Sequence, residues 1–402
     1  MDAESGDIIW TNRIEGVNET GYLDLADNLA TEIKNYLEIR AIENDVDFDL
    51  RNAYTKSPEA YRYYIDGLNS IMASDYVSAL ESLDNAIKLD STFTFAYFYK
   101  AFAYTFKLPQ DDQNMFLWTE KAYKLRENLP PKYQNWVSMW NTCYFSKDAE
   151  EIKRYCSLLE EAEIESRLFW FDLGITYSSM LMDYEKAVRA FEVIDEIDTQ
   201  RERPWEYIRY YHEYGRALIK VGNYIKAQEV FESGLNFAST NLWQREMYFN
   251  FIIIALIEGK DFDAYMEKYL ALKKEIGQSQ ATIEAHLSLI YSEAGFMTEA
   301  VEHARKAFQL DPTWDYNLAT ILIEADINIE EGIEILNKRL ETNPDAPIFF
   351  FWKAKACYKS GNYEESLSLI DKAINIWPMY LPDANILKKE VEQALANLDS
   401  EQ

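Results

Sequence analysis

Glycine and proline are scarce in this sequence, with 13 and 10 residues in a chain of 402. Folds built from many short strands use both residue types in their turns. The scarcity therefore disfavours a β-sandwich or barrel and favours helices joined by short turns. The chain does have material for a core, because 48% of its residues are hydrophobic and 15% are aromatic. That composition excludes an intrinsically disordered chain.

Cysteine and histidine are rarer still, at three residues each. Cys143, Cys156 and Cys357 are scattered and odd in number, so they define neither a disulfide framework nor a CxxC motif. None of the histidines stands in a metal-binding motif, and no glycine-rich phosphate loop occurs. We therefore predict a protein that is not an enzyme and that uses no cofactor and no metal.

Positive charge is also in deficit, with 40 Lys and Arg residues against 69 Asp and Glu residues and a formal net charge of −29. Nucleic acids and anionic membrane surfaces attract clustered cations, so neither is an expected partner. The N-terminus shows no basic and apolar signal segment, and the longest apolar run, residues 249–257, is too short to span a bilayer. We expect no membrane insertion and a cytoplasmic location, or a periplasmic one if the chain belongs to a membrane-anchored parent.

A helix-pair pattern recurs about every 34 residues. In each copy an amphipathic helix is followed by a turn and then by apolar residues at helical spacing. The turn and second helix lie at residues 75–90, 183–198, 222–235, 295–312 and 361–378. The most complete copy contains Tyr211, Tyr214, Gly215, Leu218, Gly222, Tyr224, Ala227 and Phe231. We predict that Gly215 lies where the two helices of this pair approach most closely, because it has no side chain.

This helix-pair frame resembles the tetratricopeptide repeat. The resemblance implies an all-α, right-handed superhelical solenoid of about nine helix pairs. It places the solenoid at residues 57–378 and a capping helix and tail at residues 379–402. It also implies a protein–protein interaction scaffold that binds a peptide segment or a partner protein in the concave groove of the solenoid.

Residues 1–56 do not follow the helix-pair frame. They predict a strand at residues 6–16 and an amphipathic helix at residues 19–39, which suits a remnant of an upstream α/β domain. With the segment that follows, this order resembles the C-terminal repeat region of bacterial multidomain signalling regulators of the cyclase, kinase or winged-helix type. The residues that carry the resemblance are Trp10, Ala60, Tyr61, Tyr64 and Gly67.

The second resemblance implies an alternative function. The chain would then be a regulatory or sensory module in signal transduction whose effector domain is absent from this sequence. The predicted strand has no partner strand within residues 1–56, and an unpaired strand is a template for pairing with another chain. We therefore expect residues 6–16 to pair either with a second copy of the chain, which gives self-association, or with the missing upstream domain.

A basic stripe interrupts the acidic sequence and consists of Arg209, His212, Arg216 and Lys220. Steps of three, four and four residues put these side chains on one face of a helix, about 150° away from the residues of the helix-pair frame. The tetratricopeptide resemblance places this face in the concave groove. Two interpretations stay open. The stripe is either a site for an acidic peptide segment, or a face that is solvated or neutralised by the protein's own carboxylates.

An aromatic stripe of Phe95, Phe98, Phe102 and Phe106 runs along another predicted helix. If exposed, it is an apolar patch that anchors a partner. The same spacing suits core residues, or residues covered by the N-terminal helix. We take the basic and aromatic stripes as the candidate partner-binding residues, since arginine and aromatic side chains tend to dominate binding energies.

Overall fold

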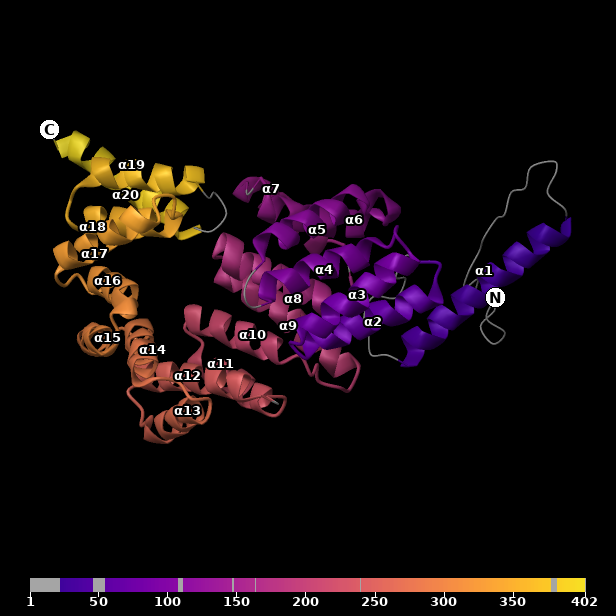
Figure 1. The fold of residues 1–402 in the computed structure, drawn as a ribbon, viewed down its shortest axis with the longest axis horizontal. Helices are drawn as coiled ribbons and strands as arrows, with labels where there is room; N and C mark the ends of the chain where they lie inside the picture. The colour runs from indigo at the N-terminus through magenta and orange to yellow at the C-terminus, as the bar shows by residue number, and fades with distance from the viewer. Residues whose placement is uncertain are drawn as a thin grey trace. The chain divides into compact units, whose positions relative to one another are not determined.

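The computed structural model describes residues 22–45, 55–107, 111–146, 148–162, 164–238, 240–376 and 382–401. Every regular element in these ranges is a helix (Figure 1), so the predicted all-α class is confirmed for this part of the chain. The strand predicted at residues 6–16 lies outside the described residues, whereas the helix predicted at residues 19–39 is present from residue 22 onward. No helix in the described ranges is long and apolar enough to cross a lipid bilayer.

The helices are short and follow one another closely. They are α1 (Tyr22–Asp45), α2 (Pro58–Met72), α3 (Tyr76–Leu89), α4 (Thr94–Phe106), α5 (Asp112–Lys124), α6 (Pro131–Tyr144), α7 (Ala149–Glu160), α8 (Arg167–Ile175), α9 (Tyr184–Gln200), α10 (Ile208–Lys220), α11 (Tyr224–Leu235), α12 (Asn241–Glu258), α13 (Asp263–Glu275), α14 (Gln280–Glu293), α15 (Met297–Leu310), α16 (Asp315–Glu324), α17 (Ile329–Thr342), α18 (Pro347–Lys359), α19 (Tyr363–Ile376) and α20 (Pro382–Glu401). Two single-turn 3-10 helices are η1 (Arg126–Asn128) and η3 (Pro312–Trp314), and a π-helix, η2 (Thr176–Leu181), continues α8.

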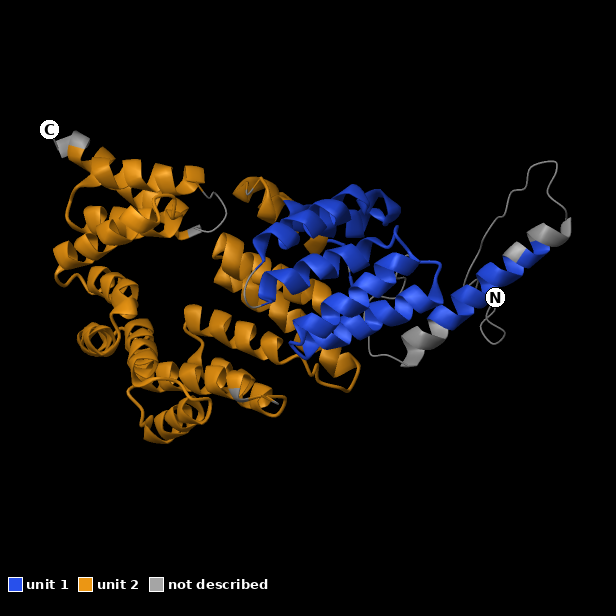
Figure 2. Ribbon diagram, in the orientation of Figure 1, with its two compact units in different colours: residues 1–141, 161–166 blue, residues 142–160, 167–402 orange. Residues whose placement is uncertain are grey.

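The chain divides into two compact units (Figure 2). Unit 1 comprises residues 1–141 and 161–166, and unit 2 comprises residues 142–160 and 167–402. In unit 1 α2 packs on α3 and α4 packs on α5. In unit 2 consecutive helices pack in pairs from α8–α9 to α18–α19, and α20 packs on α19. The predicted repetition of helix pairs is therefore present in the described part of both units.

Unit 2 is curved, with the first helix of each pair on the inside. The first helices α8, α10, α12, α14, α16 and α18 each pack on the next one, whereas successive second helices of the described pairs have no comparable contact. In a curved stack of helix pairs, the helices on the inside lie closer together than those on the outside. The first helices contact one another, so they line the inner surface. The start of α20 also packs on η2, which brings the two ends of this array together.

In the pairs α8–α9 and α10–α11 the two helices come close together at a glycine of the first helix. A Cβ atom on Gly215 of α10 would overlap the ring of Phe231 on α11, and one on Gly174 of α8 would overlap the ring of Phe191 on α9. The prediction for Gly215 is confirmed. Because the ring fills the space that a side chain would need, the ring and the bare backbone together fix the distance between the helices.

The turn between α10 and α11 is specified by local chemistry. Helix α10 is followed by Gly222, whose φ of 78° lies in the left-handed region that favours glycine. Helix α11 begins where the side chain of Asn223 accepts a hydrogen bond from the backbone N–H of Lys226. Gly295 and Gly361 have the same left-handed conformation after α14 and α18. Such turns reverse the direction of the chain, so that the second helix of the pair packs directly on the first.

The aromatic stripe of α4 is core, which corrects its assignment as a partner-binding surface. Phe95, Phe98 and Phe102 are at most 3% exposed. The ring of Trp136 on α6 lies 5.7 Å from that of Phe95 and 5.3 Å from that of Phe98. Phe106 is partly exposed and packs on Phe102. Aromatic rings of α6, rather than a partner, cover the stripe.

Replacement of Gly215 by leucine is expected to destabilise unit 2, because the new side chain must displace Phe231 from the interface of α10 and α11. Overpacking of this kind costs about 1–3 kcal/mol. Denaturation followed by circular dichroism measures the loss. The control is Ile225→Ala, since Ile225 is 71% exposed on α11 and its replacement should leave the midpoint nearly unchanged. Equal midpoints for Gly215→Leu and the parent would contradict the close approach.

Candidate partner-binding site

Helix α10 buries one face and presents the basic stripe on the other. Tyr211, Tyr214 and Leu218, which belong to the helix-pair frame, are buried. The first three residues of the basic stripe are partly exposed, and Lys220 is exposed. The inner surface of unit 2 therefore carries cations that are reachable from solvent but are not fully solvated.

Glu213 lies within the basic stripe and neutralises its first half. Its carboxylate is 3.5 Å from Nε of Arg209 and 3.6 Å from Nδ1 of His212. Burial raises the pKa of Glu213, but the neighbouring His212 and the charges of Arg209 and Arg216 outweigh burial and lower it from 4.5 to about 2. The chain thus supplies a permanent negative charge here, which agrees with the interpretation of the stripe as a self-neutralised face.

Arg216 connects three successive first helices. Its Nη1 donates to Oδ1 of Asn250 on α12 at 3.2 Å, and its Nη2 donates to Oε2 of Glu293 on α14 at 3.1 Å. Asn250 is fully buried and is held in turn by the carbonyl oxygen of Glu246, to which it donates at 2.7 Å. The guanidinium of Arg216 therefore has a fixed position on the inner surface, with one buried partner and one exposed partner.

Similar polar contacts cross from pair to pair along the rest of the array. Ser288 on α14 donates to Asn317 on α16 at 3.2 Å, and both residues are buried. Lys355 on α18 forms an ion pair with Glu324 on α16 at 2.5 Å. Because buried polar groups are costly unless they are hydrogen-bonded, these contacts fix how each pair is rotated against the next. The inner surface is consequently polar and ordered.

Trp243 on α12 is an aromatic neighbour of the basic stripe that sequence reasoning missed. Its ring centroid lies 5.7 Å from that of His212, edge to face, and its side chain is partly exposed. The spacing of Trp243 in the sequence gives no sign of this contact, because α10 and α12 are separated by a whole helix. An aromatic side chain beside an arginine-bearing face is the combination found at energetically important interface positions.

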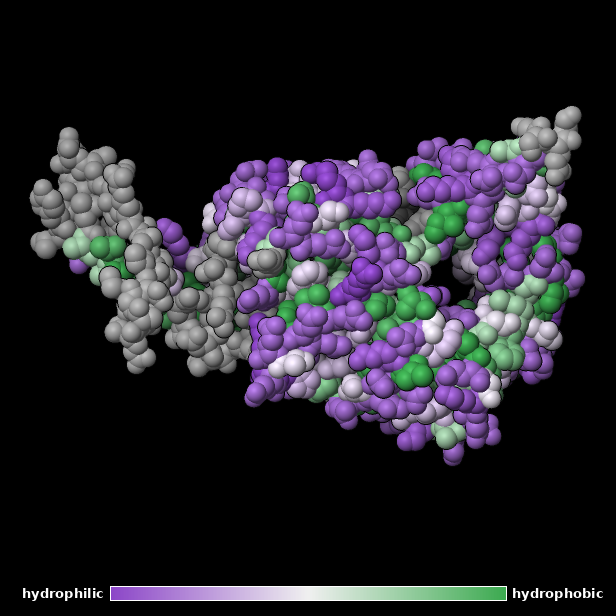
Figure 3. All heavy atoms as spheres, turned by 180° about the vertical axis from the view of Figure 1, so that it is seen from behind, coloured by the Kyte–Doolittle hydropathy of each residue, from purple (hydrophilic) through white to green (hydrophobic). Residues whose placement is uncertain are grey.

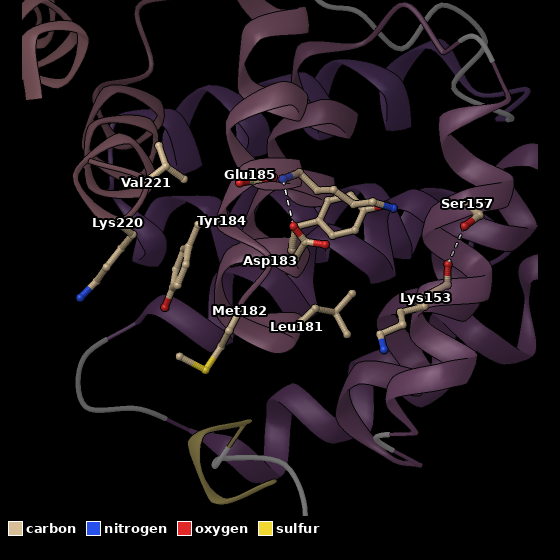
Figure 4. Close-up of a pocket in the computed structure, with 11 residues that line it drawn as sticks. Lys153, Ser157, Leu181, Met182, Asp183, Tyr184, Glu185, Lys220 and Val221 are labelled. Carbon is tan, nitrogen blue, oxygen red and sulfur yellow. Dashed lines mark hydrogen bonds between the residues drawn. The ribbon is translucent and has the colours of Figure 1, made fainter. Parts of the chain in front are cut away.

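Lys220 lies at the end of the stripe and lines a cavity of about 690 Å³, here called the turn pocket (Figure 4). The pocket is formed by Lys153 of α7, by Tyr177 and Met182 at the π-helix η2, by Lys186 of α9 and by Lys220. It therefore lies at the ends of the first helices α8 and α10, where the chain turns towards the second helices, and it shares Lys220 with the basic stripe.

Residues 208–241 match the family model for the tetratricopeptide repeat. They span α10, the turn at Gly222, α11 and the first residue of α12. The basic stripe accordingly lies on the first helix of the segment that matches this repeat, and Gly215 and Phe231 form the contact between its two helices.

Several solved structures are similar to the chain at low sequence identity, and no curated protein sequence matches it. A tetratricopeptide repeat protein from Parabacteroides merdae is 12% identical, with 83% of this chain and 99% of that chain covered and a TM-score of 0.36. The tetratricopeptide domain of P58(IPK) is 14% identical, with coverages of 84% and 98% and a TM-score of 0.26. YrrB, described as a tetratricopeptide protein with an unusual peptide-binding site, is 15% identical, with coverages of 59% and 97% and a TM-score of 0.25.

The tetratricopeptide frame is interrupted at the π-helix η2. In α10 the left-handed residue Gly222 follows the small residue Gly215 by seven positions. In the pairs that begin with α14 and α18, the left-handed glycine of the turn also follows a small residue of the first helix by seven positions. In α8 the left-handed residue is Met182, which follows Gly174 by eight positions. The additional residue lies in η2, because a π-helix accommodates one more residue per turn. This spacing was the signal in the sequence that could have located the turn pocket.

The wall of the turn pocket is built from hydrogen-bonded polar groups. Tyr177 donates from its hydroxyl to Oε1 of Glu160 at 2.6 Å, and Nζ of Lys186 lies 3.5 Å from the same hydroxyl. Burial and the hydrogen bond to Glu160 raise the pKa of Tyr177 far above its ordinary value, so it remains a phenol. Lys186 is also 3.9 Å from Glu160. These hydrogen bonds hold the side chains of the pocket wall in place. The positive charge of Lys186 is already balanced by the carboxylate of Glu160.

The three cysteines are core thiols. All are buried, and burial raises the pKa of Cys156 to about 12 and also raises the pKa of Cys143 and of Cys357. A thiol with such a pKa is not a nucleophile at neutral pH. Within the described residues, no group of three or more His, Cys, Asp and Glu side chains is arranged to hold a metal ion.

Ionised Glu213 is expected to stabilise the fold at neutral pH. Its pKa is about 2 in the folded protein against an ordinary 4.5, so this stabilisation is complete above pH 4.5 and is lost as the pH falls from 4.5 towards 2. The difference in unfolding free energy between the parent and Glu213→Gln should therefore shrink over that window. Denaturant titrations at a series of pH values measure it, with exposed Glu390→Gln on α20 as the control. A difference that stays constant across the window would contradict the lowered pKa.

Met182→Gly is expected to stabilise the protein. Met182 has φ of 53°, a conformation that costs a residue with a side chain about 1 kcal/mol and costs glycine almost nothing. Thermal unfolding should show a higher midpoint for this variant. Gly222→Ala is the matched reverse substitution at the corresponding turn, where φ is 78°, and it should lower the midpoint by a similar amount. A lower midpoint for Met182→Gly would mean that the methionine side chain contributes more than its conformation costs.

Proposed function

We propose that this protein is an interaction scaffold that binds an acidic peptide segment along the inner surface of unit 2. The observation that carries the proposal is the state of Arg216. Its side chain is 30% exposed, and Glu293, its carboxylate partner, is 32% exposed. An ion pair that both partners expose to solvent is worth only about 0–1 kcal/mol. A carboxylate of a peptide can therefore take the place of Glu293 at small cost, while buried Asn250 keeps the guanidinium in position.

The shape of unit 2 supports this proposal. Its first helices line the inside of the curve, and the contact of α20 with η2 bounds the inner surface at both ends. The space-filling view from behind shows an opening in the molecular surface (Figure 3). A segment in extended conformation can lie along such a surface and meet side chains from several helices in turn.

The chemistry next to Arg216 suits a peptide that carries both acidic and apolar side chains. Trp243 offers a partly exposed aromatic ring beside His212. It replaces the aromatic stripe of α4, which is core, as the apolar anchor of the proposed site. Lys220 continues the positive face towards the end of α10.

Binding of an acidic peptide should respond in opposite directions to the two halves of the ion pair. The probe is a fluorescein-labelled decapeptide of alternating glutamate and leucine, measured by fluorescence anisotropy. Arg216→Gln should weaken binding by about tenfold, because one charge-assisted hydrogen bond is lost. Glu293→Gln should strengthen it, because the guanidinium no longer has a competing carboxylate. Affinity should fall as salt is added.

Both substitutions break the same ion pair, so a loss of folding stability affects them alike and cannot produce opposite effects on binding. Lys306→Gln on α15, a second helix, is the control for net charge and should leave the affinity unchanged. Weaker binding by both variants would mean that the ion pair only holds α10 and α14 together. An unlabelled glutamine–leucine decapeptide that competes as well as the acidic one would also contradict the proposal.

A further inference from the structure

The turn pocket has the dimensions and the charge of a site for an anionic ligand. Its volume of about 690 Å³ falls among those of small-molecule sites, which span roughly 300–1,000 Å³. Three of its lining residues are the lysines Lys153, Lys186 and Lys220, which come from three different helices. Two carboxylates, Asp183 and Glu185, also line it. The lining itself carries three positive and two negative charges, and Glu150 and Glu160 beside it pair with Lys153 and Lys186.

The charged side chains of the pocket differ in how strongly they already interact with other groups of the chain. Asp183 accepts a hydrogen bond from the backbone N–H of Lys186 at 3.1 Å and so caps α9, and the side chain of Lys186 is close to Glu160. Lys153 lies 2.8 Å from Glu150, but both side chains are more than half exposed, so this pair is weak. Lys220 forms no ion pair with any residue that the structure describes. Lys153 and Lys220 are consequently the cations that a ligand can engage.

An apolar surface lies between these two lysines. Figure 4 shows Lys153 on one side of the pocket and Lys220 on the other, with the side chains of Leu181 and Met182 between them. A single compact anion would meet one lysine and leave the apolar side chains uncovered. A ligand with an acidic group at each end and an apolar middle would satisfy all four side chains.

The pocket exists because this helix pair departs from the frame that the other pairs follow. The additional residue in η2 lengthens the turn, and Met182 takes a left-handed conformation that Gly222, Gly295 and Gly361 have in three other pairs and that Ser74 and Asp326 have in two more. Backbone strain of this kind persists only where the surroundings impose it, and it concentrates at functional sites. The side chain that causes the strain is also one that lines the pocket.

We propose that the turn pocket binds an organic dianion, in which two carboxylates are joined by a short apolar chain, with one carboxylate on Lys153 and the other on Lys220. Two sources can supply this chemistry, a free dicarboxylate or a peptide with two acidic side chains flanking apolar ones. The pocket shares Lys220 with the basic stripe, but neither Arg216 nor Glu293 lines it, so the dianion site adjoins the proposed peptide site without including its central ion pair.

Isothermal titration calorimetry on the full chain tests the proposal with straight-chain dicarboxylates from succinate to suberate and with the peptide acetyl-Glu-Leu-Leu-Glu-amide. We expect one dicarboxylate length or the peptide to bind, and octanoate, which has a single carboxylate, to bind about tenfold more weakly. A preference for the free dicarboxylate identifies a small metabolite as the ligand class, and a preference for the peptide identifies an acidic protein segment. Absence of binding by every dicarboxylate and by the peptide overturns the proposal, as does equal binding of octanoate.

Variants locate the binding in the turn pocket. The double variant Lys153→Gln/Lys220→Gln should lose the binding, whereas Lys306→Gln and Arg216→Gln should retain it. Lys306 is the matched control because, like Lys153, it is an exposed lysine in an ion pair with a glutamate of its own helix. Unchanged binding by the double variant overturns the proposal. Loss of binding by Arg216→Gln would move the ligand to the inner surface and overturn it as well.

Met182→Gly separates ligand binding from folding. The variant should unfold at a higher temperature than the parent and yet bind the ligand more weakly, because the apolar middle of the ligand loses its contact. A binding loss in a more stable protein cannot come from misfolding. Undiminished affinity in this variant would overturn the role of Met182 and with it the apolar part of the proposed ligand.

Discussion

In α8–α9 and α10–α11 the two helices lie in close contact where the first helix has no side chain, at Gly174 and Gly215. In both, a phenylalanine ring of the second helix fills the vacant space. This contact fixes the separation within a pair. Once that separation is fixed, the first helices of successive pairs pack on one another and the second helices do not, which curves unit 2. The position of the basic stripe on the inner surface follows from this contact.

The inner surface shows how an acidic protein accommodates a row of cations. Glu213 neutralises Arg209 and His212 from within their own helix, and Arg216 obtains its partners from two other helices. A half-buried guanidinium without hydrogen-bond partners would be costly, so these contacts serve folding first. The same contacts are only partly shielded from water, and for that reason they are exchangeable. Structural pairing and readiness to bind are compatible at Arg216 because both partners of its ion pair with Glu293 remain about one third exposed, at 30% and 32%.

The turn pocket illustrates a different relation between structure and function. The helix-pair frame is consistent from pair to pair, and local rules of spacing and turn chemistry agree with it at Gly222, Gly295 and Gly361. At η2 and Met182 both rules are broken in one place, and a cavity lined by three lysines results. Violations of local rules that stay in a folded protein are concentrated where the sequence serves something besides stability. The π-helix η2, rather than the left-handed residue, therefore distinguishes this pair, because Ser74 and Asp326 are also left-handed without being glycine.

The sequence by itself determined the helical class, the pairing of helices, the close approach at Gly215 and the face of α10 on which the basic stripe lies. These features depend on residues near one another in the chain, so periodicity and spacing are sufficient to predict them. Only the tertiary structure decided what covers each face. The aromatic stripe is core because Trp136 of a later helix lies on it, and Arg216 is paired with Glu293, which is 77 residues away. Periodicity tells which side of a helix a residue occupies, but the neighbour on that side is set by packing between segments that are distant in sequence.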